Sequence, residues 1–215
     1  MNLQLVCMAN SKKYGERCIA GIVVEQKNNR LVTVWKEAGS PQWIRPVTDE
    51  VHGQVPAKLV KDVQIGDLLE IQTIAALPNG FQQENVLFRS KSLAKTNHAN
   101  FTRATLQKLL YQGERLFKNE LHRLPATELN GLDHSLLLIH VQDFFPAIEV
   151  INYKPILRAC FTWKDVPYHM PVTDVHFNLR YRENPDQWQQ PQEAWLTISL
   201  GLEYEGFHYK LIAGV

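Results

Sequence analysis

The residues best suited to chemistry are basic and aromatic side chains in three parts of the sequence. Basic side chains bind phosphate and aromatic rings stack on bases, so the combination is typical of surfaces that hold single-stranded nucleic acid. One group lies near the N-terminus, a second in the middle of the chain and a third near the C-terminus. The candidate nucleic-acid-binding residues are Lys12, Lys13, Arg17, Trp43, Arg45, Arg103, Lys108, Arg115, Tyr209 and Lys210.

Positive charge is concentrated in the span from Arg89 to Arg123. This span holds eight Lys and Arg residues and two Glu residues, a net charge of +6, whereas the whole chain carries a formal net charge of +1. The rest of the chain is therefore net negative. Such a span is either a solvated surface or a site of phosphate contact, and the sequence leaves both interpretations open.

Trp43 and Arg45 belong to a predicted strand that reaches Pro46. A tryptophan in a strand either packs in the core or offers a face for base stacking. An arginine between Ile44 and Pro46 either pairs with a carboxylate, for which Asp49 is the candidate, or faces a ligand. Both alternatives remain for both residues.

Other chemistries have less support. Cys7, Cys18 and Cys160 lack the spacing of a zinc ribbon, and no two histidines have the spacing of metal ligands on a helix. We therefore expect no metal site and no cofactor. Motifs of phosphate-binding loops, dinucleotide-binding folds and serine hydrolases are missing. An enzyme is not indicated, although Cys7, Asp49 and Asp174 are the candidates for one that acts on a nucleotide or modified base.

The composition is that of an ordinary globular protein. Hydrophobic residues make up 45% of the chain and charged residues 21%. An odd number of cysteines and a start without a secretory leader are typical of a reducing compartment. No apolar run approaches the ~20 residues that a membrane helix needs. We expect a soluble cytoplasmic protein with no membrane partner.

Short strand-forming runs, bounded by Gly, Pro and Asn turns, must position the candidate residues. In the run that begins at Val175, apolar residues alternate with His176, Asn178 and Arg180, which predicts a half-buried strand. Many short strands without alternating helices favour barrels or a sandwich over a parallel nucleotide-binding sheet. Strands are predicted at 18–25, 31–35, 67–74, 135–141, 155–163, 168–172, 175–181, 195–200 and 207–213.

One amphipathic helix is predicted over about 100–124. Leucines from Leu106 to Leu124 fall on one stripe at helical spacing, Asn100 or Thr102 can cap the start, and Pro125 ends the pattern. The helix would carry part of the basic span on its other face.

A tetrapeptide, Pro-Val-Thr-Asp, occurs at 46–49 and again at 171–174. In both places a tryptophan and a short turn precede it, at Trp35 and at Trp163. Proline suits the edge or end of a strand because it lacks an amide donor, and Thr and Asp bind nearby backbone amides in the turn that follows. The repeat therefore indicates a duplicated unit and marks a strand end in each copy.

Six segments resemble a known family. They are LVCMANSKKYGERCIAG at 5–21, WIRPVT at 43–48, QENV at 83–86, SLLLIHV at 135–141, YHMPVTD at 168–174 and ISLGLEYEGFHYKLIAG at 198–214. These segments are similar to those of the bacterial dual OB-containing domain proteins. The resemblance implies two oligonucleotide/oligosaccharide-binding (OB) barrels in tandem and a role linked to nucleic acid, and it supplies no catalytic residues.

The expected fold is therefore mainly β, with two tandem OB-like barrels and one amphipathic helix between them. We expect the first barrel at 1–75, a connecting segment with the basic helix at 76–133, and the second barrel at 134–215. The expected function is binding of nucleic acid, with single-stranded DNA or RNA favoured, within a bacterial defence or DNA-processing system. The alternatives are a protein–protein adaptor within a complex and a small enzyme.

Overall fold

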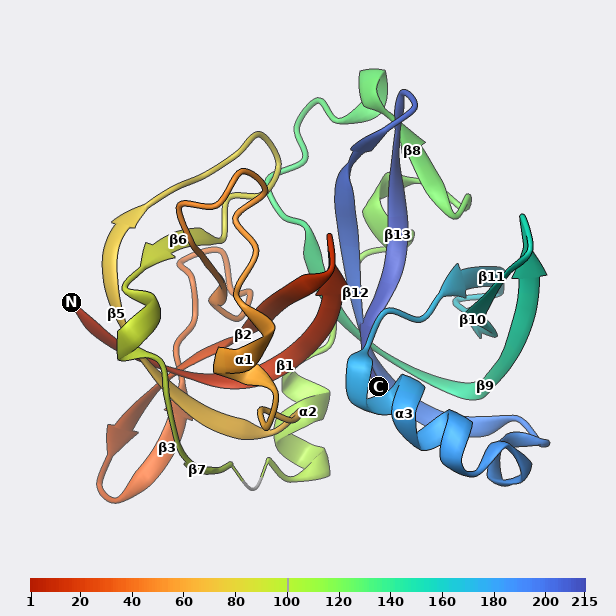
Figure 1. The fold of residues 1–215 in the computed structure, drawn as a ribbon. Helices are drawn as coiled ribbons and strands as arrows, with labels where there is room; N and C mark the ends of the chain where they lie inside the picture. Colours follow the sequence, from red (N-terminus) through yellow and green to blue (C-terminus); the bar gives the residue numbers. More distant parts are fainter. Residues whose placement is uncertain (100) are drawn as a thin grey trace. The chain divides into compact units, whose positions relative to one another are not determined.

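A computed structural model describes residues 1–99 and 101–215. The chain folds as two compact units, Met1–Leu109 and Leu110–Val215, and each is described separately (Figure 1). Within the described residues, no helix combines the length and the apolar character needed to cross a membrane.

The first unit is a five-stranded barrel. Its strands follow the order β1-β2-β4-β6-β5, and β5 pairs with β1 to close the ring. All of these pairs are antiparallel except β4 with β6, which run parallel. This order, with a helix between the third and fourth barrel strands, is that of an OB barrel. The elements are β1 (Asn2–Lys13), β2 (Glu16–Lys27), β3 (Arg30–Thr33), β4 (Trp43–Val47), α1 (Ala57–Val60), β5 (Asp67–Ala76), β6 (Asn85–Phe88), the 3-10 turn Ser90–Ser92, β7 (Ala94–His98) and α2 (Arg103–Leu109).

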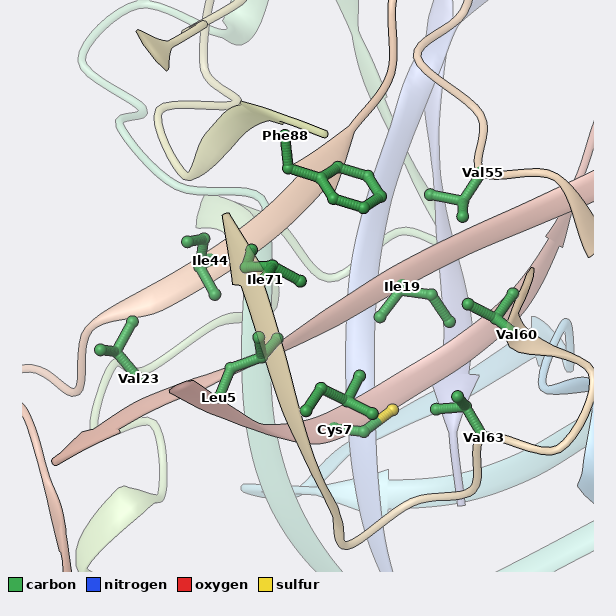
Figure 2. Packing of buried hydrophobic residues seen from close by; sticks show 11 residues of the cluster. Leu5, Cys7, Ile19, Val23, Ile44, Val55, Val60, Val63, Ile71 and Phe88 are labelled. Atoms are coloured by element: carbon green, nitrogen blue, oxygen red, sulfur yellow. The ribbon is translucent and has the colours of Figure 1, made fainter. Parts of the chain in front are cut away.

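Apolar side chains from every strand of this barrel meet in its interior (Figure 2). Leu5 and Cys7 come from β1, Ile19 from β2, and Val60 and Val63 from α1 and the turn after it. Burial of each larger side chain contributes about 1.5–3 kcal/mol. The interior cluster is Leu5, Cys7, Ile19, Val23, Ile44, Val55, Val60, Val63, Leu69, Ile71 and Phe88.

The second unit follows the same path but closes less completely. Its strands lie in the order β11-β10-β9-β12-β13-β8. The third and fifth barrel strands, β11 and β13, meet through one parallel bridge that joins Val172 to Ile212. The elements are the 3-10 turn Leu116–Lys118, β8 (Arg123–Pro125), the 3-10 turn Ala126–Glu128, β9 (Leu136–Ile151), β10 (Lys154–Trp163), β11 (Val166–Pro171), α3 (Val175–Glu183), the 3-10 turn Pro185–Trp188, β12 (Gln192–Tyr204) and β13 (Phe207–Gly214).

The segment before β9 lies along the edge of β13 that faces this open seam. β8 pairs with residues 207–209 of β13, and the Lys210 amide donates to the His122 carbonyl at 2.9 Å. Leu116, Phe117 and Leu124 of this segment are fully buried. The segment therefore supplies part of the packing that a closed seam would otherwise provide.

The two copies of Pro-Val-Thr-Asp occupy equivalent places. Pro46 is paired with Val86 in the parallel contact between the third and fifth strands of the first barrel, and Val172 makes the corresponding bridge in the second. Each copy is followed by the helix that precedes the fourth strand. The predicted fold class, mainly β with two tandem OB-like barrels from a duplicated unit, is confirmed.

The predicted helix is much shorter than 100–124. Asn100 lies outside the described residues, the Thr102 hydroxyl accepts from the Thr105 amide at 3.1 Å, and α2 ends at Leu109. The Tyr111 amide then donates to Leu138 of β9. The helical spacing of the leucines therefore does not correspond to one buried face after Leu109, because Leu116 and Leu124 are buried whereas Leu121 is 60% exposed.

The predicted strand over 175–181 is wrong, because these residues form α3. The Asp174 side chain accepts a hydrogen bond from the Phe177 amide at 3.0 Å and so caps the helix. Phe177 is fully buried but Leu179 is 53% exposed. The alternating pattern therefore did not correspond to two faces of a sheet, and the cap decided the local structure.

Candidate functional site

The second unit carries basic side chains on the outward faces of β10 and β11. Leu157 and Ala159 of β10 point inward and are buried, so Arg158 between them points outward. Its Nη2 donates to the His169 carbonyl of β11 at 2.8 Å, and its Nε lies 3.3 Å from His169 Nε2. The guanidinium group and the imidazole ring are thereby held together on adjacent strands.

Glu149 of β9 fixes this pair. One carboxylate oxygen lies 2.6 Å from His169 Nε2 and the other lies 3.5 Å from Arg158 Nε. The side chains of His169 and Glu149 are 42% and 39% exposed, whereas that of Arg158 is 16% exposed. The carboxylate therefore orients the arginine side chain, which is partly exposed to solvent.

Aromatic side chains lie on the outward face of β13. The guanidinium carbon of Arg123 lies 3.9 Å from the centre of the Phe207 ring, and Arg123 Nη1 donates to the Tyr209 hydroxyl at 3.3 Å. The ring of Tyr209 is 6.1 Å from that of His122 and 6.4 Å from that of Tyr204. Stacked guanidinium and aromatic groups of this kind form rigid platforms.

His122 lies among these groups, because it directly precedes Arg123 and its ring is 6.1 Å from that of Tyr209. Desolvation lowers the pKa of His122, and the positive charges of Arg123, Arg158, His169 and Lys210 lower it further. The exposed Tyr153 and Tyr204 lie in or beside the β9–β10 and β12–β13 turns, which are the loops that flank the ligand in OB barrels. We call this surface the basic-aromatic face, formed by His122, Arg123, Arg158, His169, Phe207 and Tyr209.

Two of the residues predicted for binding lie on β13, at different depths. Tyr209 is part of the basic-aromatic face. Lys210 points inward and is fully buried; its Nζ donates to the carbonyl and to the side-chain oxygen of Asn119, each at 2.8 Å, and lies 5.3 Å from the Tyr168 ring centre. Burial lowers the pKa of Lys210 to about 7.

In the first barrel, the structure brings some of the predicted residues together. Lys12 and Arg17 are direct partners in the β1–β2 hairpin. Desolvation lowers the pKa of Lys13, the Cys18 side chain raises it and the charge of Arg45 lowers it again. Trp43 is half-buried at the start of β4.

Arg45 is paired inside the barrel wall. Its side chain is 2% exposed, and Nη1 lies 3.3 Å from a Glu84 carboxylate oxygen and donates to Asn85 Oδ1 at 3.1 Å. The carboxylate partner is therefore Glu84, whereas Asp49, the partner considered from the sequence, is exposed.

The basic span is divided between the two units. Arg103 and Lys108 lie on α2 of the first unit, whereas Arg115 belongs to the second unit and pairs with Glu120 at 2.7 Å. Lys95 pairs with Asp67 at 2.8 Å. The charge counted in the sequence is therefore not gathered on one helix.

Of the residues considered for catalysis, Cys7 and Asp174 are buried, and Asp49 is exposed. Cys7 is fully buried in the first barrel. Asp174 is 1% exposed and caps α3. Over the part of the chain that the structure describes, no three His, Cys, Asp or Glu side chains gather as metal ligands.

Sequence reasoning missed Arg158, His169, His122, Arg123 and Phe207 as members of one surface. The alternation of Leu157, Arg158 and Ala159 was an available signal that Arg158 faces outward. The convergence of β8, β10, β11 and β13 depends on the barrel order, which no local pattern contains.

Comparison with protein families agrees with this topology. The family model of the dual OB-containing domain matches residues 3–215. The chain belongs to this family. No curated protein matches the sequence significantly.

Solved structures similar to this dual OB-containing chain share little sequence with it. A crystal structure of a HINb domain is 9% identical, with 99% of this chain and 91% of that chain covered and a TM-score of 0.38. A tetrameric HIN2 structure is 7% identical, with 99% and 87% covered and a TM-score of 0.30. A replication protein A heterotrimer bound to single-stranded DNA is 10% identical, with 98% and 46% covered and a TM-score of 0.32. TM-scores this low support no inference about this chain.

Proposed function

We propose that this protein binds single-stranded nucleic acid on the basic-aromatic face of its second unit. The observation that carries the proposal is the arrangement of Arg123 against Phe207 and Tyr209, beside Arg158 and His169. OB barrels hold ligands across their second and third strands, between the first and last hairpin loops, and this face has that position on β10 and β11.

The arginines and the aromatic rings of this face would contact different parts of the nucleic acid. The guanidinium groups of Arg158 and Arg123 would bind phosphate oxygens, because their planar donors match that geometry. The exposed Tyr204, with Phe207 and Tyr209 behind it, would stack on bases, at about 1–3 kcal/mol per base. Stacking and phosphate contact are both tolerant of sequence, so we expect weak base preference.

Binding of a fluorescein-labelled oligo(dT) or oligo(rU) of about 20 nucleotides, followed by anisotropy, tests the proposal. Arg158→Ala and Arg123→Ala should each weaken binding about tenfold, because a charge-assisted contact is lost. The slope of log K against log salt should fall by about 0.7 for each lost phosphate contact.

Arg182→Ala is the matched control, because Arg182 is an exposed arginine of the same unit on α3. It should bind like the unchanged protein. An absence of salt-sensitive binding at micromolar protein, or equal affinities for all three variants, would contradict the proposal.

The β9–β10 hairpin favours a second candidate function, that of a protein–protein adaptor. Phe145, Ile148, Val150, Ile151 and Tyr153 are all at least 38% exposed there, and several exposed apolar side chains on one hairpin are typical of an interaction surface. In this case Val150→Asp should abolish association with a partner while oligonucleotide affinity is unchanged. Partner association that persists in Val150→Asp would contradict the adaptor role of the hairpin.

A further inference from the structure

Glu149 places a carboxylate in contact with two groups of the basic-aromatic face. One of its oxygens lies 2.6 Å from His169 Nε2 and the other lies 3.5 Å from Arg158 Nε. The second arginine of this face, Arg123, contacts an aromatic ring and a tyrosine hydroxyl, and among the described residues it forms no ion pair. The two arginines therefore differ, because Arg158 already contacts an anion and Arg123 does not.

The strand register places these three side chains on one face of the sheet. Arg158 of β10 is paired with Ala147 of β9, and Glu149 lies two positions further along β9. His169 of β11 is paired with Cys160, which lies two positions after Arg158 on β10. Paired residues and residues two positions apart in a strand share a face, so all three side chains point outward, and all three are partly exposed.

The carboxylate occupies the position that a phosphate oxygen would take between these two groups. A guanidinium binds carboxylates and phosphates with the same donors, so the two anions compete for one place. Arg158 is also anchored without Glu149, because its Nη2 donates to the His169 carbonyl at 2.8 Å. The carboxylate can therefore leave by rotation of one side chain while the arginine keeps its position.

We propose that Arg158 and His169 form a phosphate subsite that the Glu149 carboxylate occupies in the free protein, so that a backbone phosphate of the nucleic acid binds there by displacing Glu149. This inference rests on the proposed function. It adds a competitor that the chain itself supplies. A phosphate reaches Arg123 directly, whereas at the subsite it gains only the difference between its own contacts and those of the carboxylate.

Two changes at position 149 test the displacement, with affinity measured by anisotropy of labelled oligo(dT) at constant salt. Glu149→Gln removes the charge and should tighten binding about fivefold, since a partly exposed ion pair no longer opposes the phosphate. Glu149→Asp keeps the charge but is shorter by one methylene, about 1.5 Å, so its carboxylate no longer reaches both groups. It should also tighten binding, by about twofold or more.

Two controls separate displacement from the general effect of a lost negative charge. Glu183→Gln removes an exposed carboxylate of the same unit at the end of α3, and it should leave the affinity within about twofold because exposed charges are screened. In an Arg158→Ala background, Glu149→Gln should gain much less than in the unchanged protein, since the group that the carboxylate masks is gone.

The outcomes separate the displacement from the proposed function. Equal or weaker binding by Glu149→Gln overturns the displacement, and weaker binding would show that the carboxylate only supports Arg158. A gain in Glu149→Gln that persists undiminished in the Arg158→Ala background, with none in Glu149→Asp, overturns it as well, because the cause would be repulsion at a distance. In these cases the unchanged protein still binds and the proposed function stands. No binding by any of these proteins overturns both.

Discussion

A buried basic side chain lies where the third and fifth strands of each barrel meet, Arg45 in the first and Lys210 in the second. The positive charges of the two side chains are compensated differently. In the first barrel, Arg45 on the third strand is paired in register with Asn85 on the fifth. Lys210 is the counterpart of Asn85 in the second barrel, because it follows Asn85 by 125 residues, the same offset as that between the two tetrapeptide copies. The cation therefore lies on the third strand in one barrel and on the fifth in the other. A carboxylate compensates Arg45, whereas neutral oxygens hold Lys210.

Lys210 should make the stability of the second unit depend on pH. The pKa of Lys210 is about 7 when folded, against 10.5 for an ordinary lysine. Between these values the unfolded chain binds more protons, so the free energy of unfolding should rise with pH, by up to about 1.4 kcal/mol per unit. Urea unfolding at pH values of about 7 and 9 should show this rise in the unchanged protein and not in Lys210→Met. Parallel changes in both proteins would contradict the assignment.

Glu84→Gln should be strongly destabilising, because it leaves the buried charge of Arg45 without its counterion. We expect a loss of about 3–5 kcal/mol in the free energy of unfolding, measured with urea. Glu25→Gln, at the exposed pair of Glu25 with Lys27, is the control and should cost less than about 1 kcal/mol. Adding Arg45→Met to Glu84→Gln should recover stability; a further loss would show that the ion pair is not the reason.

At the scale of elements, the threonine hydroxyl of each tetrapeptide copy donates to a backbone carbonyl, and the two copies differ most at the aspartate. Thr48 Oγ1 donates to Gln54 and accepts from the Glu50 amide, and Thr173 Oγ1 donates to Ile212. Asp174 is buried and accepts from the amides of Phe177 and Val215, each at 3.0 Å. Only in the second barrel does the aspartate begin a long helix.

Asp174→Ala should therefore cost about 2 kcal/mol or more, since a helix cap and a second buried amide lose their acceptor. Asp49→Ala, the same change at the exposed copy, should cost less than about 0.5 kcal/mol. Urea unfolding of the two variants makes the comparison within one chain. Equal losses would contradict the structural difference between the copies.

The sequence predicted strands where apolar runs are flanked by turn residues, and it failed where two patterns competed. Of the strand predicted over 135–141, residues 136–141 lie in β9, and all of 207–213 lies in β13. Over 175–181 the alternation of apolar and polar residues predicted a strand. In the structure, the hydrogen bond from the Phe177 amide to the Asp174 side chain caps a helix there instead. Beyond Leu109 the leucine spacing was helical, but tertiary hydrogen bonds to β9 end the helix.

At the scale of the whole molecule, the duplication and the family could be inferred from sequence, and the candidate surface could not. The tetrapeptide repeat and the six quoted segments pointed to two barrels. Tyr209, a predicted binding residue, lies on the outward face of β13, whereas Arg158 and His169 become neighbours only through the pairing of β10 with β11. Long-range pairing, rather than residue type, therefore defines the basic-aromatic face.

The place of β13 in the chain has a consequence for the order of events during synthesis. β8, β10 and β11 all precede β13, yet Arg123 rests on Phe207 and Tyr209 of that strand. Because domains fold as units while the chain is made from its N-terminus, the first barrel can form early. The basic-aromatic face can form only after β13 has left the ribosome, and therefore later than the first barrel.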